Sequence, residues 1–463
     1  MIEYREINVF WKDRHTLRIF SKKTALILMI SLAALVLAGC LRVSADDLYK
    51  LPEVSEEYLR LQAQINTVLS QGAEFSPPTG GPNRQAVQLK DLNGNGINEV
   101  LAFFSVPGES TLKIYIFRMI DGDYTVAEVI EGTGAAIESV RYADMDGDGI
   151  VEIIIGWQMG ASLKFFTIYS IKDFHGVLLA REEYSELTVF DLNGDGNDDI
   201  VALRLPTQEI GALAMFYTLM PDGEIVNEEA RLSSGIEAIT RVLTGRLLDG
   251  VPALFVESEG RYEEGSFVTD VFAFRDGGFS NISLQVSGGI SEDTVRQRII
   301  YSSDINKDGI VKVPIPRLLK AQSETAYYAI DWYAFNSSGA IQLALTTYHN
   351  NFDEWYLILP LDWRGRVSVR REDVVSGERT VIFSYIVGEE GPYEDFLKVY
   401  RLSGEIGEER ANLPGRTVLM SEGASVYAFE LLAPPNSFGL TFDETLIKEN
   451  FRLIYSDWLA GTD

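Results

Sequence analysis

The sequence predicts a mainly β protein built largely from one repeated unit, and three observations carry this prediction. Short acidic loops of one pattern recur along residues 91–313. Each loop is flanked by alternating or apolar runs, which are typical of strands on both sides of a turn. Beyond about residue 350, apolar runs alternate with turns that contain glycine or proline. We therefore expect repeated β units followed by a small mixed β domain.

The loops occupy four aligned segments, 91–100, 144–153, 191–200 and 304–313, and share the pattern D-x-[DN]-x-[DN]-G-x-x-[DE] or a variant of it. Calcium prefers about six to eight hard oxygen ligands in a flexible cage. Positions 1, 3, 5 and 9 of such a loop supply side-chain oxygens, and position 7 supplies a backbone carbonyl. The glycine at position 6 permits the positive φ that the reversal needs.

We expect calcium in the first three loops, about three ions in all, with a structural role. The predicted ligands are Asp91, Asn93, Asn95, Ile97 and Glu99 in loop one, Asp144, Asp146, Asp148, Ile150 and Glu152 in loop two, and Asp191, Asn193, Asp195, Asn197 and Asp199 in loop three. Affinity rises with ligand charge, so it should fall in the order two, three, one. Loop four carries Lys312 at position 9, and we expect its ammonium to replace the ion among Asp304 and Asp308.

Two helical calcium motifs share the start of this pattern, but both need an acid at position 12. Here position 12 is apolar in every loop: Ala102, Ile155, Ala202 and Ile315. The loops therefore open strands. In this they resemble FG-GAP/VCBS repeats, the blades of β-propellers like that of integrin α. The resemblance covers residues 86–349 and implies a propeller in which a calcium loop joins two strands of each blade.

The spacing of the loops reveals one more repeat. Position 5 falls at Asn95, Asp148, Asp195 and Asp308, which leaves one interval about twice as long as the others. Asp249, within the segment 245–256, fills this gap, and the intervals become 53, 47, 54 and 59 residues. Such periods suit four-stranded blades. We expect about five blades; a sixth from the chain ends or the C-terminal segment is the alternative.

The N-terminus has the features of an export signal. A basic stretch precedes the apolar run 24–38, which is short for a membrane span. The run ends in Leu37-Ala38-Gly39-Cys40 and resembles the bacterial lipobox, in which the cysteine receives a diacylglycerol. Cys40 is the sole cysteine. We therefore expect a lipoprotein signal peptide over 1–39 and a lipidated tether over 40–85, with a helix at 55–70 and a Pro/Gly linker at 75–83. The alternative is a plain signal peptide or an uncleaved anchor, with a chance cysteine at position 40.

The charge restricts the partners. The chain carries a net charge of −28, and residues 1–39 contribute +3, so the remainder carries −31. So acidic a surface repels nucleic acid, and we expect no nucleic-acid partner. The predicted contact with the membrane is the lipid anchor, on the extracytoplasmic face of the cell membrane.

The segment 350–463 is predicted as a C-terminal β-rich domain. Strand candidates lie at 355–359, 366–370, 380–387, 396–402 and 425–432, and helical spacing covers 442–458. The stretch 347–365 resembles stretches of Firmicutes lipoproteins that carry VCBS repeats. Its aromatic residues, Tyr348, Trp355, Tyr356 and Trp363, are expected to pack the junction with the propeller; a sugar-stacking platform is the alternative.

No catalytic motif accompanies these features. Of the three histidines, His15 falls in the predicted signal peptide, His175 in a turn and His349 at the predicted domain junction. We therefore expect a binding or scaffolding lipoprotein of the cell envelope, whose partner is an envelope protein or polysaccharide. The alternative is an envelope hydrolase of glycans or phosphodiesters with the propeller as an accessory module.

Overall fold

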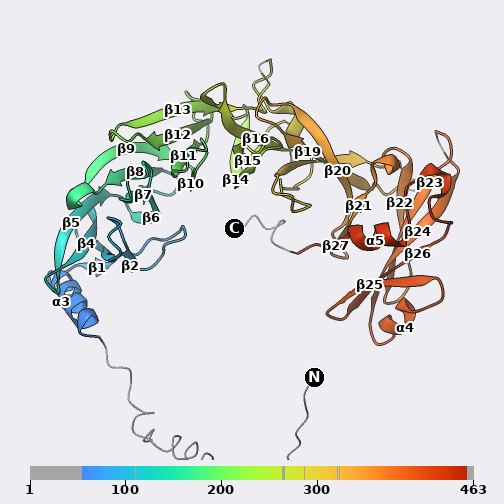
Figure 1. The fold of residues 1–463 in the computed structure, drawn as a ribbon, viewed down its shortest axis with the longest axis horizontal. Helices are drawn as coiled ribbons and strands as arrows, with labels where there is room; N and C mark the ends of the chain where they lie inside the picture. Colours follow the sequence, from blue (N-terminus) through green and yellow to red (C-terminus); the bar gives the residue numbers. More distant parts are fainter. Residues whose placement is uncertain are drawn as a thin grey trace, which may run out of the picture. The chain divides into compact units, whose positions relative to one another are not determined.

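The computed structural model describes residues 55–455, apart from residues 110, 263–265, 286, 321, 323 and 390. In this part of the chain the strands form six antiparallel sheets, which we number in chain order (Figure 1). Sheet 1 contains β1 (Glu74–Phe75), β2 (Val87–Lys90), β3 (Glu99–Ser105), β4 (Thr111–Ile120) and β5 (Asp123–Thr133). Sheet 2 contains β6 (Ala136–Ala143), β7 (Glu152–Gln158), β8 (Lys164–Ser170) and β9 (Val177–Tyr184).

The next two sheets are also four-stranded meanders. Sheet 3 contains β10 (Glu186–Phe190), β11 (Asp199–Arg204), β12 (Leu213–Leu219) and β13 (Ile225–Arg231). Sheet 4 contains β14 (Ile236–Arg246), β15 (Pro252–Gly260), β16 (Ser266–Arg275) and β17 (Gly278–Asn281). The predicted repeat around Asp249 is therefore confirmed as the β14–β15 hairpin of a complete sheet.

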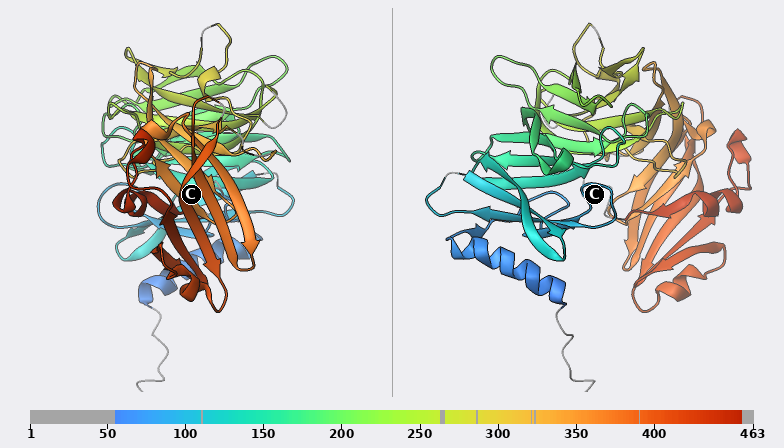
Figure 2. Two further views of the ribbon diagram at one scale, coloured as in Figure 1. Left: turned by 90° about the vertical axis from the view of Figure 1, so that its right-hand side faces the viewer. Right: turned by 60° about the vertical axis from the view of Figure 1, so that its left-hand side comes forward.

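The last two sheets are five-stranded and are drawn in orange and red (Figure 2). Sheet 5 contains β18 (Lys312–Leu318), β19 (Tyr328–Phe335), β20 (Ile341–Asn350), β21 (Trp355–Leu359) and β27 (Phe451–Leu453). Sheet 6 contains β22 (Val367–Val375), β23 (Glu378–Ile386), β24 (Tyr393–Ser403), β26 (Ser425–Leu431) and β25 (Arg416–Glu422). β20 pairs with β21 across residue 350, where the sequence predicted a division between domains.

Apolar clusters join each sheet to the next, because both faces of these sheets carry apolar side chains. Sheets 1 and 2 share a buried cluster that includes Leu101, Ile114 and Ile155. Equivalent clusters join sheets 2 and 3, sheets 3 and 4, and sheets 4 and 5. A large cluster joins sheets 5 and 6, and it contains Tyr348, Trp355 and Trp363, so the expected packing role of these three aromatics is confirmed. The fourth, Tyr356, is also buried but lies outside this cluster and lines a cavity.

The Pro/Gly segment that the sequence predicted as a linker is hydrogen-bonded along two strands. The backbone N–H of Ser76 donates to the carbonyl of Phe103, and those of Thr79 and Gly80 donate to the carbonyls of Ile137 and Glu138. An extended segment satisfies its backbone groups in this way when a strand lies alongside it. The segment therefore lies against the strands β3 and β6 and is not a free linker.

The helices agree with the sequence at their starts. α3 runs over Glu56–Ser70, and the Ser55 hydroxyl accepts the N–H of Tyr58 at 3.2 Å. α5 runs over Glu444–Asn450, with Asp443 as its N-cap. The prediction that this helix extends to residue 458 is wrong, because Phe451–Leu453 pairs with β21 as β27. A short helix, α4, covers Gly407–Ala411.

The described chain divides into two compact units. The first contains the described part of Met1–Thr67 together with Ile120–Tyr124. Within it, the Tyr124 hydroxyl donates to Glu57 at 3.0 Å. The second unit contains the described parts of Val68–Met119 and Thr125–Asp463. Over the described residues, no helix has the length and apolarity that a bilayer span requires. The run 24–38 and Cys40 lie outside the described residues.

Candidate metal centres

Loops one to three join β2 to β3, β6 to β7 and β10 to β11, and loop four precedes β18. All four have the same hydrogen-bond pattern. The N–H of the position-6 glycine donates to the position-1 aspartate at 2.7 to 3.1 Å. The N–H at position 7 donates to the side-chain oxygen at position 5 at 2.7 to 2.9 Å. These bonds fold each loop so that its side-chain oxygens lie on the inner side of a tight reversal.

The acid at position 9 is the first residue of the following strand and is buried in loops one to three. Glu99, Glu152 and Asp199 are exposed by only 3%, 2% and 0%. Each accepts the N–H of position 2 at 3.0 to 3.1 Å. This bond leaves further carboxylate lone pairs, and a buried carboxylate is costly unless a cation or further donors accompany it.

Loop two brings the most charge together. Asp144, Asp146 and Glu152 each have a carboxylate oxygen, and these oxygens all lie within 4.8 Å of one another. The fourth acid of the loop, Asp148, forms an ion pair with Lys172 at 3.1 Å. Burial, with the neighbouring aspartates adding to it, raises the pKa of Glu152 to about 7. The donor set is the one that a hard divalent cation such as calcium prefers.

Loops one and three carry fewer charges, in line with their sequences. Burial raises the pKa of Asp199 to about 6 and also raises the pKa of Glu99. In loop one, the amide of Asn93 donates to Glu99 at 3.2 Å. In loop three, the amide of Asn193 donates to Asp195 at 2.9 Å. The asparagines therefore provide oxygens without adding to the repulsion between acids.

Loop four shows what the shared geometry does with a cation. The Lys312 ammonium donates to Asn306 Oδ1 at 2.6 Å, to Asp308 Oδ1 at 2.6 Å and to the carbonyl of Ile310 at 2.9 Å. It also lies 3.6 Å from Asp304 Oδ1. These oxygens come from positions 3, 5, 7 and 1 of the loop. The predicted ion pair of Lys312 with Asp304 and Asp308 is confirmed.

The charge on Lys312 lowers the pKa of an acid in loop four, whereas the pKa of the position-9 acid in loop two is raised. Burial by itself would raise the pKa of Asp308, but hydrogen bonds from Lys312 and Asn306 outweigh burial and lower it to about 2. Glu152, in the loop with four acids, shows the opposite shift. The oxygens of this loop geometry thus surround a cation in loop four. Loops one to three have an acid instead of a cationic side chain at position 9.

The β14–β15 hairpin has a turn at the equivalent place but lacks the set of side-chain oxygens that the other loops carry. Its Asp249 accepts the N–H and the hydroxyl of Ser337 at 3.0 and 2.7 Å. Position 9 is Ala253, which is fully buried. Asp249 therefore links this hairpin by hydrogen bonds to the loop between β19 and β20 of sheet 5.

Successive loops contact one another, which the sequence did not indicate. The N–H of Val151 donates to the carbonyl of Leu92 at 2.8 Å, and the N–H of Asp198 donates to the carbonyl of Asp144 at 3.2 Å. The N–H of Val311 donates to the carbonyl of Arg246 at 3.0 Å in the same manner. The loops thus link neighbouring sheets through their backbones.

The two described histidines differ in exposure. His175 is exposed beside a short 3-10 turn. The ring of His349 lies between Trp332 and Tyr356, and burial lowers its pKa to about 3. His349 is therefore neutral at physiological pH and belongs to the packing of sheet 5.

The repeat of loop, strand and loop over the first two sheets has a counterpart among known families. Residues 91–155 match the FG-GAP-like repeat family. The matched FG-GAP-like repeat runs from Asp91 of loop one through β3–β6 and loop two into β7. A search among curated proteins found no match to the chain.

Several solved structures are similar to parts of the chain at low identity. An exotype rhamnogalacturonan lyase, YesX, has 14% identity and a TM-score of 0.25, covering 67% of this chain and 69% of its own. A protein from Lactobacillus plantarum has 8% identity and a TM-score of 0.28, covering 69% and 85%. Sqt1 from Chaetomium thermophilum has 11% identity and a TM-score of 0.29, covering 76% and 97%.

Proposed function

We propose that this chain is a lipid-anchored binding or scaffolding module of the cell envelope, whose first three repeats are held by calcium. The observation that carries the calcium proposal is the pair formed by loops two and four. Both loops have the same fold, and in loop four the oxygens surround an ammonium. In loop two, position 9 is an acid and three acids converge, while Lys172 pairs with Asp148 alone from outside the loop.

Calcium at loops one to three would do structural work. It would neutralise buried carboxylates that are otherwise crowded or partly protonated, and it would fix the turns that join β2 to β3, β6 to β7 and β10 to β11. Because the loops bond to one another through their backbones, an ion in one loop also supports its neighbour. We also propose that the sheets close into a ring, as is expected of a β-propeller.

The anchoring part of the proposal rests on the motif Leu37-Ala38-Gly39-Cys40. Two acyl chains on Cys40 would hold the protein on the membrane surface. Mass spectrometry of protein extracted from membranes of the native host tests this. A mature N-terminus at Cys40 with a diacylglycerol is expected, and an unmodified Cys40 would contradict it.

The calcium proposal is tested by isothermal titration calorimetry on residues 41–463 after removal of divalent ions. We expect about three calcium ions to bind per chain. Replacing Glu152 by Gln should remove the tightest site, whereas the control Asp249→Asn should leave all sites intact. Titration that shows no calcium binding would contradict the proposal.

A further inference from the structure

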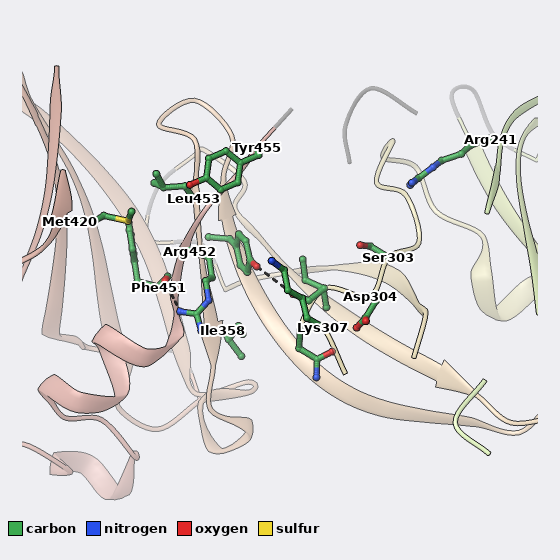
Figure 3. Close-up of a pocket in the computed structure, with 13 residues that line it drawn as sticks. Arg241, Ser303, Asp304, Lys307, Ile358, Met420, Phe451, Arg452, Leu453 and Tyr455 are labelled. Atoms are coloured by element: carbon green, nitrogen blue, oxygen red, sulfur yellow. Dashed lines mark hydrogen bonds between the residues drawn. The ribbon is translucent and has the colours of Figure 1, made fainter. Parts of the chain in front are cut away.

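A cavity of about 580 Å³ lies beside loop four and is lined by several cations. Three cations line it: Arg241 from β14, Lys307 from loop four and Arg452 from β27. Figure 3 shows Arg241 on one side of the cavity and Arg452 on the other, with Lys307 between them in this view. Such a cluster of cations is unusual in a chain of net charge −28, in which acidic residues outnumber basic ones.

The cavity has little negative charge to balance these cations. Asp304 is the one carboxylate among the described lining residues. It already accepts the N–H groups of Asp308 and Gly309 and lies close to Lys312. Within the described chain, neither Lys307 nor Arg452 forms an ion pair with a carboxylate, and both are exposed. The cavity therefore has a net positive charge that faces solvent.

Lys307 occupies a position that the other loops give to glycine. Position 4 is Gly94, Gly147 and Gly194 in loops one to three, with φ between +70° and +80°. Lys307 has the same left-handed conformation, φ +59°. A residue with a side chain pays about 1 kcal/mol or more for this conformation, and such strain is often found where a side chain has a function. The side chain that this backbone carries is one of the three cations that line the cavity.

The other lining groups favour a sugar over a simple ion. Ser303 and Tyr455 offer hydroxyl groups, and Tyr455 is 59% exposed. Tyr356 and Arg452 are paired residues on neighbouring strands, which places an aromatic ring beside a cation. Sugars with acidic groups present hydroxyls, apolar ring faces and charge together. The volume lies within the range of about 300–1,000 Å³ that is typical of small-ligand sites.

We propose that this cavity binds an acidic oligosaccharide, whose carboxylate or phosphate groups pair with Lys307, Arg452 and Arg241. The proposal rests on the binding role proposed above and gives it a ligand class. The charge of the remaining surface repels anions generally, so that binding would be confined to this cavity. Screening by salt acts over about 8 Å at physiological ionic strength, so that the local cations dominate over the distant acids.

The test is isothermal titration calorimetry of the soluble body, residues 41–463, with trigalacturonate, with inorganic tripolyphosphate and with neutral maltotriose. The protein is loaded with calcium and then exchanged into buffer without free calcium, because sugar acids themselves bind calcium. We expect trigalacturonate to bind with an affinity that falls as NaCl is raised. Maltotriose should bind far more weakly. Binding of maltotriose equal to that of trigalacturonate, or binding of tripolyphosphate alone, would overturn the proposal.

Two variants locate the site. Arg452→Gln and Lys307→Gly should each weaken trigalacturonate binding about fivefold, as expected for the loss of one exposed ion pair. Lys307→Gly places the residue of the other loops at this position, so that folding is retained. Arg84→Gln is the matched control, because Arg84 is also exposed and also donates to a backbone carbonyl. Unchanged affinity in both cavity variants would overturn the proposal.

The same samples separate this proposal from the calcium proposal. Calcium titration of Arg452→Gln and Lys307→Gly should match that of the wild type, because neither residue belongs to loops one to three. If calcium binds and the sugar acid does not, the cavity proposal fails alone. If calcium does not bind to the wild type, the calcium-held module fails irrespective of the sugar result.

Discussion

At the scale of single residues, the acid or base at position 9 decides what each loop can hold. The sequence predicted a calcium ligand at Glu152 and an internal ammonium at Lys312, because the two residues stand at equivalent positions in aligned loops. The structure confirms the position of the ammonium and shows that the position-9 acids are buried. Burial of these acids was beyond the sequence, since it depends on the sheets that pack around the start of each strand.

The raised pKa of Glu152 predicts how pH affects the calcium-free protein. Its folded pKa of about 7 lies above the usual value of 4.5, so that the folded state binds more protons than the unfolded state between these values. Stability in chelator should therefore fall as pH rises from about 5 to 8, by an amount on the order of 2–4 kcal/mol from this residue. Chemical denaturation at both pH values measures it.

Glu152→Gln isolates this contribution from that of other buried acids. Without calcium, the variant should lose less stability than the wild type as pH rises, because it has no proton to release at this position. With calcium, the wild type should be the more stable at pH 8. An identical pH dependence for the two proteins in chelator would contradict the assignment to Glu152.

Replacing Lys312 by Glu should convert loop four into a calcium loop. The change removes the internal cation and restores the acid of the other loops at position 9. In chelator we expect a loss of about 1–3 kcal/mol, because Asp304 and Asp308 lose their partner while remaining partly exposed. Calcium should restore much of this stability and add one site in a titration. Lys312→Met, which lacks the carboxylate, should lose stability without gaining a site.

At the scale of elements, the sequence predicted what local patterns determine. The helix starts at Ser55 and Asp443 and the strand at Trp355–Leu359 follow capping and alternation. The end of α5 was predicted wrongly, because Phe451 and Leu453 suit both a helix and an edge strand, and pairing with β21 decides between them. β25 was missed for a related reason: it is a half-exposed strand with a weak apolar pattern.

The contacts between loops predict a difference between two glycines of loop one. A methyl group added at Gly94 would lie 2.6 Å from the carbonyl oxygen of Gly149, whereas one added at Gly96 would have no neighbour within 4 Å. Both residues have positive φ, so each change to Ala should cost about 1–2 kcal/mol from the backbone alone. Gly94→Ala should cost clearly more, as measured by denaturation in calcium. Equal losses would mean that the loops do not support one another.

At the scale of the whole molecule, the sequence established a repeat and its period, and the structure adds the sixth sheet. Intervals between loops located five sheets, because one loop lies within each of the first four and another directly precedes β18. Sheet 6 has no such loop; its strands were predicted as a separate domain, with a sixth blade as the alternative. The cavity with Arg241, Lys307 and Arg452 was not predictable, since these residues meet across more than two hundred positions; the lysine at a glycine position was the one signal in the sequence.

The repeats should also differ in their dependence on calcium along the chain. Loops one to three open β3, β7 and β11, whereas β18 follows a loop that holds its own cation. Removal of calcium should therefore loosen sheets 1 to 3 and leave sheets 5 and 6 ordered. A chain of net charge −28 gains further from calcium, because each bound ion reduces repulsion among its acids.

Hydrogen exchange, measured by mass spectrometry with calcium and with chelator, tests whether calcium holds the first three loops. We expect chelation to speed exchange in peptides that cover loops one to three and the strands β3, β7 and β11. Peptides that cover loop four and β18–β20 should exchange at the same rate in both conditions. Equal exchange with and without calcium in loops one to three, or a loss of protection that is the same in loop four, would contradict this expectation.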